Sequence, residues 1–194
     1  MNRNNYAIVT ARLGLRTWLP KDTTPFVEMN ADPEVMRFFP KTLSRLETES
    51  FIKIIEEHFQ EKGYGLFAVD ELASHRFIGF IGLHTAMFES TFTPCVEEGW
   101  RLDRRFWGNG YASEGAAACL RHGFEKLGLT EILSFTSAVN HRSVAVMKRI
   151  GLRYRMDFGH PKIDPKHQLF PHVLYGLTQV EYESKGLLNG NRSD

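Results

Sequence analysis

The stretch that decides the fold is Arg105-Phe106-Trp107-Gly108-Asn109-Gly110-Tyr111-Ala112-Ser113-Glu114. It joins an expected strand to an amphipathic helix, and two glycines stand two residues apart at the junction. Because glycine lacks a Cβ atom, the backbone there can turn sharply and approach a ligand closely. The start of the helix leaves N–H groups without an internal acceptor, and the helix dipole makes that end positive. The stretch therefore fits a phosphate-binding loop, or a glycine turn that only connects strand to helix.

Two common nucleotide-binding loops do not fit this stretch. A dinucleotide-binding loop has a third glycine where this chain has Ser113, and it follows a buried apolar strand. The segment before the loop, 96–103, carries four charged residues instead. No Gly-Lys-Ser or Gly-Lys-Thr follows, as a Walker loop requires. These features disfavour a flavin or nicotinamide oxidoreductase and a nucleotide hydrolase, and they leave a polar strand that leads into a pyrophosphate-type loop.

Composition sets the outer limits on the class of protein. The chain has 194 residues, of which 42% are hydrophobic, so we expect one domain over residues 1–194 with a sizeable core. A net charge of +1 argues against a nucleic-acid partner. Cys95 and Cys119 have no neighbours at metal-ligand spacing, which predicts reduced thiols and no metal. Without an apolar run of about 18 residues or a signal peptide, the chain is expected to be cytoplasmic and to have no membrane partner.

Apolar spacing and turn residues predict an α+β domain with a mixed sheet. Ser44 and Glu47 form a capping box before a long helix whose buried stripe should include Ile54. The Asn- and Gly-rich tail, 186–194, is expected to fray. Expected helices occupy 20–30, 33–39, 44–63, 112–127 and 140–151, and expected strands occupy 13–18, 66–70, 77–84, 96–103, 132–139, 152–158 and 173–177.

Three motifs in order resemble one family. The pattern Arg105-x-x-Gly108-x-Gly110 is similar to the acetyl-CoA pyrophosphate loop of the GNAT superfamily of N-acetyltransferases, and 97–102 resembles the strand before that loop. The segment 140–152 resembles the Asn-x-x-Ser helix of the family and its glycine end. The branch that it resembles most is the RimJ/RimL-like group, whose named members acetylate N-termini of ribosomal proteins. The resemblance covers about 11–183, and it implies a GNAT fold: a mixed, mostly antiparallel central sheet flanked by helices, with a splayed strand pair holding acetyl-CoA.

The resemblance also implies which residues bind acetyl-CoA. Backbone groups before the loop would hold the thioester where two strands splay, and Gly99 fits a bulge there. The alternatives are plain sheet pairing for these residues and a simple helix cap for Asn140. The expected binding residues are Trp100, Arg101, Leu102, Arg105, Phe106, Trp107, Gly108, Asn109, Gly110, Tyr111, Ala112, Asn140 and Ser143.

Glu97 and Glu98 are the candidates for the general base, and Glu97 is the expected one, because a carboxylate at a cleft edge can accept a proton directly or through a water. Adjacent strand residues face opposite sides, so Glu98 should point away if Glu97 points into the cleft. The alternative for both is a solvated strand face. His84 ends a strand that faces the expected cleft, and it either touches substrate or is structural.

Ser143 is the expected proton donor to the departing thiolate. Many GNAT enzymes have a tyrosine four residues further on, but this chain has Met147, so the donor is Ser143 or a water. The alternative for Ser143 is a hydroxyl bonded to the helix backbone. Phe88, Phe92 and Phe170 lie in expected loops, where they either line an acceptor pocket or anchor the loops.

The sequence thus predicts an acetyl-CoA-dependent N-acetyltransferase. The acetyl group would move to a primary amine, on a protein N-terminus or a small molecule, by direct attack in a ternary complex without a metal. The alternative is a non-catalytic acyl-CoA-binding or regulatory module of the same fold. We expect a monomer or a homodimer.

Overall fold

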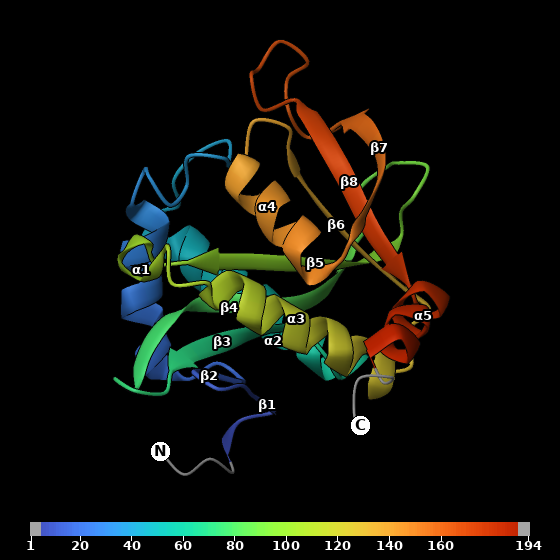
Figure 1. Cartoon of the computed structure of the whole chain (residues 1–194). Helices are drawn as coiled ribbons and strands as arrows, with labels where there is room; N and C mark the ends of the chain where they lie inside the picture. The colour runs from blue at the N-terminus through green and yellow to red at the C-terminus, as the bar shows by residue number, and fades with distance from the viewer. Residues whose placement is uncertain (1–4, 190–194) are drawn as a thin grey trace.

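In the computed structural model, which describes residues 5–189, eight strands form one sheet in the order β1-β2-β3-β4-β5-β6-β8-β7 (Figure 1). Neighbouring strands pair antiparallel except β5 and β6, which pair parallel. The expected α+β class with a mixed, mostly antiparallel sheet is therefore confirmed. The strands are β1 (Ile8–Val9), β2 (Leu13–Arg16), β3 (Leu66–Glu71), β4 (Arg76–Ala86), β5 (Cys95–Leu102), β6 (Glu131–Ser137), β7 (Arg153–Gly159) and β8 (Pro171–Thr178).

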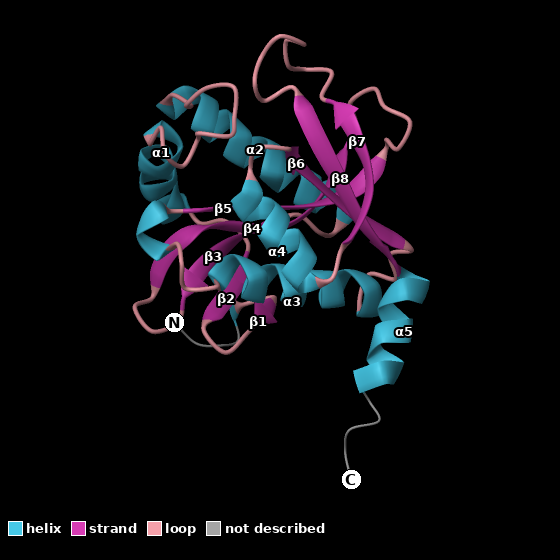
Figure 2. Ribbon diagram, turned by 45° about the horizontal axis from the view of Figure 1, so that its top comes forward, coloured by secondary structure: helices cyan, strands magenta, loops and turns pink. Residues whose placement is uncertain are grey.

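Helices cover both faces of the sheet (Figures 1 and 2). Alternate residues of β3 join different clusters: Phe67 and Val69 pack with α3, while Leu66 and Ala68 pack with α1 and α2. None of the described helices is both long and apolar enough to cross a bilayer. The helices are α1 (Thr23–Ala31), α2 (Arg45–Lys62), α3 (Tyr111–Glu125), α4 (His141–Ile150) and α5 (Gln179–Asn189), with short 3-10 turns η2 (Pro20–Asp22) and η3 (Arg104–Phe106).

The expected boundaries of α2 and α4 are confirmed by their caps. Ser44 Oγ accepts from the N–H of Glu47 at 3.3 Å, and the Glu47 carboxylate accepts from the N–H of Ser44 at 2.8 Å. Gly63 ends α2 with a φ of 75°, and Gly151 ends α4 with a φ of 95°. Both are left-handed conformations that favour glycine, which is why these two glycines stop the helices.

Two local predictions are wrong. Ile54 is 59% exposed, because the buried side of α2 runs through Thr48 and Ile55. The segment 33–39 forms turns instead of a helix. There the N–H of Met36 donates to the carbonyl of Asp32 at 3.0 Å and the N–H of Phe39 donates to the carbonyl of Met36 at 2.8 Å, so separate turns form without a continuous helical ladder.

The tail also differs from its prediction. Helix α5 includes residues 186–189, which were expected to fray, while 190–194 lie outside the described residues. The helix begins with a second capping box, in which Thr178 Oγ1 accepts from the N–H of Glu181 at 3.2 Å. The Glu181 carboxylate accepts from the N–H of Thr178 at 2.9 Å. The spacing Thr178-x-x-Glu181 was therefore a readable signal for this helix.

A buried ionic cluster ties β2, η2 and β3 together. The Arg16 guanidinium donates to both oxygens of Asp22, at 2.6 and 2.9 Å, and to both oxygens of Asp70, at 2.6 and 2.9 Å. The side chains of all three residues are at most 3% exposed. Asp22 also accepts from the N–H of Leu19, and Asp70 accepts from the hydroxyl of Tyr6. With both carboxylates satisfied, the cluster fixes one end of the sheet beneath α1.

Candidate functional site

Strands β5 and β6 separate soon after they meet. Within residues 5–189, their pairing is a single bridge between Glu97 and Leu133, and Ser134 Oγ donates to the carbonyl of Glu98 at 2.8 Å. In Figure 1, β6 runs obliquely to the direction of β5. The expected bulge at Gly99 is wrong, because the β4–β5 register runs unbroken from Ala86↔Cys95 to Gly79↔Leu102. The sheet therefore opens on the β6 side of β5, beyond Glu98.

The glycine loop lies at the end of β5 and leads into α3. Gly108 and Gly110 have φ values of 80° and 79°, the left-handed region that glycine tolerates. The first helical bond joins the N–H of Glu114 to the carbonyl of Gly110 at 3.0 Å, so residues 111–113 have no helical acceptor for their N–H groups. A Cβ atom at Gly108 would meet nothing within 4 Å. The loop thus offers several N–H donors and a positive helix end to an anion with open space in front of it.

Several loop residues that are expected to bind acetyl-CoA also make contacts that fix the loop to the protein. Phe106 and Tyr111 are each 9% exposed, and the Tyr111 hydroxyl donates to Glu71. The indole N–H of Trp107 donates to the carbonyl of Leu102 at 2.8 Å. Ala112 lies in the first turn of α3, and the ring of Trp107 lines the cavity described below. That these residues bind acetyl-CoA stays a prediction.

Arg105, one of the residues expected to bind acetyl-CoA, is engaged with a neighbour. Its guanidinium forms a fork on the Asp103 carboxylate, with Nε bonds of 3.0 and 2.9 Å. Instead, Arg12 reaches the loop from the start of β2, where it donates to the carbonyl of Asn109 at 2.9 Å and pairs with Glu114 at 2.6 Å. Sequence reasoning missed Arg12 because 97 residues separate it from Asn109.

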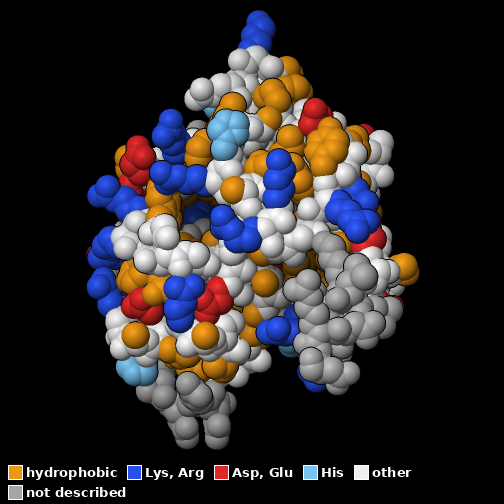
Figure 3. All heavy atoms as spheres, in the orientation of Figure 1, with side chains coloured by type: hydrophobic (Ala, Val, Ile, Leu, Met, Phe, Trp, Pro, Cys, Tyr) orange, Lys and Arg blue, Asp and Glu red, His pale blue; other side chains and the backbone are white. Residues whose placement is uncertain are grey.

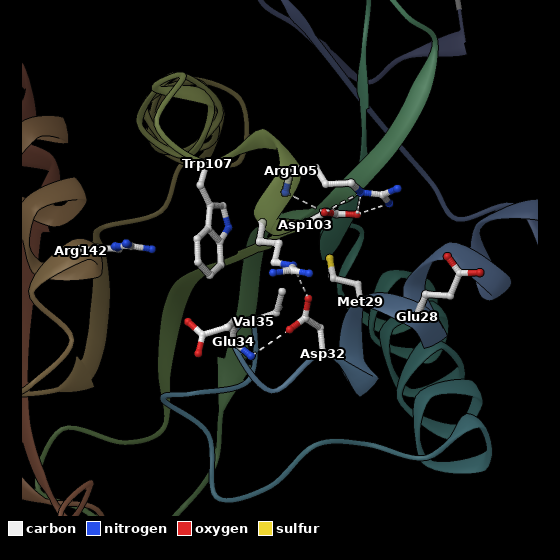
Figure 4. A pocket seen from close by; sticks show the side chains of 10 residues that line it. Glu28, Met29, Asp32, Glu34, Val35, Asp103, Arg105, Trp107 and Arg142 are labelled. Carbon is white, nitrogen blue, oxygen red and sulfur yellow. Dashed lines mark hydrogen bonds and ion pairs between the residues drawn. The ribbon is translucent and has the colours of Figure 1, made fainter.

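A cavity of about 640 Å³, here called the β5-end cavity, borders the loop. Figure 4 shows Trp107 in front of the loop and Arg142 reaching toward it from the first turn of α4, with the guanidinium 5.0 Å from the ring centre. On the opposite wall Arg104 pairs with Asp32 at 2.7 Å. Figure 3 shows Lys and Arg side chains around a hollow on this face of the molecule. The open end of the splay therefore meets a cavity of mixed charge, lined by three arginines and four carboxylates. Arg142, one of these arginines, was not among the residues expected to bind acetyl-CoA.

Helix α4 begins where β6 ends, on the far side of the splay. Asn140 Oδ1 accepts from the N–H of Ser143 at 3.3 Å, and its Nδ2 donates to Ser143 Oγ and to Thr136 Oγ1, each at 3.0 Å. Asn140 is the expected cap, with its amide oriented by three partners. Met147 is 1% exposed and belongs to an apolar cluster with Leu120, and its thioether has no proton to donate.

Glu97 and His84 form a pair on the face of the sheet away from α3. They are register partners on β5 and β4, and Nε2 of His84 lies 3.2 Å from Oε2 of Glu97. The Glu97 side chain is 13% exposed, and burial raises its pKa well above the ordinary value. Burial, and to a lesser extent the charge of His58, lowers the pKa of His84 to about 4. Near neutral pH the imidazole is thus uncharged and can donate to or accept from the carboxyl.

The pair lines a second cavity of about 430 Å³, here called the His84 cavity. Its floor is made by the ends of β4, β5 and β6, and its walls come from the loop after β4 and the loop after β7. Nδ1 of His84 is buried and has no hydrogen-bond partner among the described residues. A titratable pair with a shifted pKa at the bottom of a cavity is the usual place for proton transfer.

Glu98 and Arg101 lie away from these cavities. Glu98 is fully buried on the α3 face near Cys119, its two oxygens lack partners in the described part of the chain, and burial raises its pKa. Arg101 is 8% exposed, donates to Asn30 Oδ1 at 2.7 Å and lies 4.1 Å from the ring of Phe39. The expectation that Glu98 points away from Glu97 is confirmed, and Arg101 can offer only its backbone to a thioester. Residues 5–189 contain no group of three or more metal-ligand side chains.

Comparisons with known proteins agree on one family. The family model described as acetyltransferase (GNAT) domain matches residues 12–153. The chain is 31% identical over 150 residues to YkkB of Bacillus subtilis (strain 168), covering 76% of this chain and 85% of that protein. It is 28% identical over 176 residues to the N-acetyltransferase YnaD of the same strain, covering 90% and 98%. Two solved structures are similar over 90% of this chain and 99% of the matched chain. One is a GNAT-family acetyltransferase from Bacillus anthracis, with a TM-score of 0.73 and 26% identity. The other is spermidine N-acetyltransferase from Vibrio cholerae in complex with CoA and spermine, with a TM-score of 0.70 and 18% identity.

Proposed function

Because the chain belongs to the acetyltransferase (GNAT) family, we propose that it moves the acetyl group of acetyl-CoA directly to a primary amine. The GNAT fold and the acetyltransferase class implied by the resemblance are confirmed by this membership. The observation that carries the proposal is the opening between β5 and β6, which has the glycine loop at one end and Glu97 at the other. The fold shared with a Vibrio cholerae enzyme solved with CoA supports this choice of acetyl donor.

The loop fits the pyrophosphate of acetyl-CoA. The N–H groups of 111–113 and the open space at Gly108 together suit a doubly charged anion, while Arg12, paired with Glu114, holds the loop through the carbonyl of Asn109. From there the pantetheine would follow the unpaired edge of β5, where the backbone of Trp100, Arg101 and Leu102 lies along the opening. The thioester would then lie between Ser143 on α4 and Glu97 on β5. In this placement acetyl-CoA would fill the opening between β5 and β6 from the glycine loop to Glu97.

The transfer proceeds by nucleophilic attack in a ternary complex. The amine nitrogen attacks the thioester carbonyl carbon, so that a C–N bond forms and the C–S bond breaks. Glu97 removes the proton from the amine, directly or through a water, and His84 holds the carboxyl in place. The CoA thiolate takes a proton from Ser143 or from water. No enzyme side chain carries the acetyl group.

The experiment that tests the proposal measures CoA thiol release with a panel of amines, together with mass analysis of the acetylated products. Release of CoA and formation of acetylated amine in equal amounts would support the proposal. Acetyl-CoA binding without transfer to any amine would favour the non-catalytic module. The motifs resemble those of the RimJ/RimL-like branch, so peptides with free N-termini belong in the panel beside small amines.

Gly110→Val should weaken acetyl-CoA binding about tenfold or more. A β-branched residue is strained at a φ of 79° and crowds the N–H groups that would hold the pyrophosphate. Gly128→Val is the matched control, since Gly128 has a φ of 65°, open space within 4 Å, and lies beyond the other end of α3. Calorimetric titration of both folded variants checks this. Equal affinities in Gly110→Val and wild type, or equal losses in both variants, would contradict the phosphate assignment.

Ser143→Ala should lower kcat by no more than about tenfold, or roughly 1.4 kcal/mol, and leave the affinity for acetyl-CoA unchanged. The expected effect is small because a thiolate is a tolerable leaving group near neutral pH. Asn140 can still cap α4 through its bond to the N–H of residue 143. Steady-state rates across the neutral pH range provide the measurement. Full activity at every pH would identify solvent as the proton source.

A further inference from the structure

One wall of the His84 cavity is aromatic. The ring of Phe88, from the loop after β4, lies edge-on to Phe135 of β6 with 5.3 Å between ring centres, and 4.8 Å from the ring of His160. Burial and the charges of His172 and Lys162 lower the pKa of His160 to about 4, so this ring is neutral near pH 7. The cavity therefore presents three uncharged rings beside the Glu97–His84 pair.

A second layer of rings holds this wall in place. Phe158 of β7 lies 5.8 Å from Phe135, Phe92 lies 4.9 Å from Phe158, and His172 of β8 lies 4.9 Å from His160. The packed rings come from three strands and two loops, so the wall is formed before any ligand binds. Such a preformed apolar wall favours a ligand with a flat or bulky apolar group, because stacking on it costs little ordering of side chains.

The charges around the cavity are sparse and positive at the rim. Lys162 lines the cavity from the loop after β7, and none of the described carboxylates pairs with it. Glu97, at the floor, is the only acidic residue among those that line the cavity in the described structure. A ligand with two or more ammonium groups would find a single carboxyl at the floor and a cation at the rim.

We propose that the acceptor is a molecule with one primary amine, an aromatic or bulky apolar group next to it, and an anionic group that Lys162 binds. The amine would reach Glu97, and the apolar group would lie against Phe88 and Phe135. The aromatic wall also attracts the ammonium form of the amine before it loses its proton. A polyamine is disfavoured, because its additional ammonium groups would lie near the Lys162 cation. This inference rests on the proposed acetyl transfer and names its substrate class.

The test compares kcat/KM for L-phenylalanine, L-phenylalaninamide and spermidine. Wild type should prefer L-phenylalanine about tenfold or more over each of the others, since the amide lacks the anionic group and spermidine adds cations. Lys162→Glu should reverse the order of L-phenylalanine and spermidine, and Phe88→Ala should lower kcat/KM for L-phenylalanine about tenfold. A peptide with N-terminal Phe-Asp has the same chemistry, so its rate relative to L-phenylalanine distinguishes a protein N-terminus from a free amino acid.

Lys166→Glu is the matched control, because Lys166 lies exposed in the same loop and does not line the cavity. It should leave all three kcat/KM values at the wild-type level. Preference of wild type for spermidine, or the same preferences in Lys162→Glu and wild type, would overturn the proposal. If no amine is acetylated, calorimetric binding of the same three amines in the presence of CoA tests the cavity alone, and acetyl-CoA binding tests the donor site separately.

Discussion

Glu97→Gln should lower kcat by about 10²–10⁴-fold, the usual range for loss of a general base. The amide keeps the shape of the side chain at the bottom of the His84 cavity and its contact with His84, but it cannot accept a proton. Since burial raises the pKa of Glu97, the wild-type rate should increase as the pH rises through that raised value. The variant should lose this dependence, and its affinity for acetyl-CoA should stay at the wild-type level.

Glu98→Gln is the matched control for this result. Glu98 is the next residue on β5, it is equally carboxylic and more deeply buried, and it faces α3 instead of the cavity. Its kcat per folded molecule should therefore stay near the wild-type value. A Glu97→Gln enzyme with unchanged kcat and an unchanged pH profile would make Glu97 structural and leave a water chain as the base.

Asp70→Ala should lower the free energy of unfolding by about 3–5 kcal/mol. The substitution leaves the Arg16 guanidinium 3% exposed with Asp22 as its remaining carboxylate partner, and it removes the acceptor of the Tyr6 hydroxyl. Urea denaturation, with the midpoint and the slope analysed together, measures the change. Because β2 and β3 carry the core beneath α3, the loss should appear as global unfolding.

Glu57→Ala is the control for the ionic cluster. Glu57 pairs with Lys53 at 3.7 Å on the surface of α2, where both side chains are more than half exposed. Screening by water makes such a pair weak, so the loss should stay below about 1 kcal/mol. Similar losses in Asp70→Ala and Glu57→Ala would mean that burial adds nothing to the cluster. Asp70→Asn keeps the shape of the side chain and two of the acceptor directions. Its loss of unfolding free energy should therefore lie between those of Asp70→Ala and Glu57→Ala.

The parts of the fold that were predictable from sequence are those set by neighbours along the chain. Ser44 and Glu47 are three residues apart, Gly63 follows the last turn of α2, and Gly108 and Gly110 lie directly before α3, so each interaction could be read locally. Helix α5 had the same kind of signal at Thr178. Ile54 was assigned to the buried face of α2, but it is exposed and its neighbour Ile55 is buried. Where apolar residues are adjacent, spacing alone does not fix which of them faces the core.

The parts of the site that were missed depend on residues far apart in the chain. Arg12 meets the glycine loop only because β1 and β2 pack beside α3, and His84 meets Glu97 only through the register of β4 and β5. One local feature was missed as well: Asp103 and Arg105 are two residues apart, but spacing alone does not distinguish a paired guanidinium from a free one. The aromatic wall likewise needs three strands in place before its rings converge.

A crystal structure of the protein with bound CoA tests the central claim most directly. We expect the pyrophosphate within hydrogen-bond distance of the backbone N–H groups between Gly108 and Ala112, the pantetheine along the open edge of β5, and the sulfur beside Ser143. The acetyl group that this sulfur carries in acetyl-CoA would then point toward Glu97. A pyrophosphate bound elsewhere, with β5 and β6 closed against each other beyond Glu98, would contradict the account.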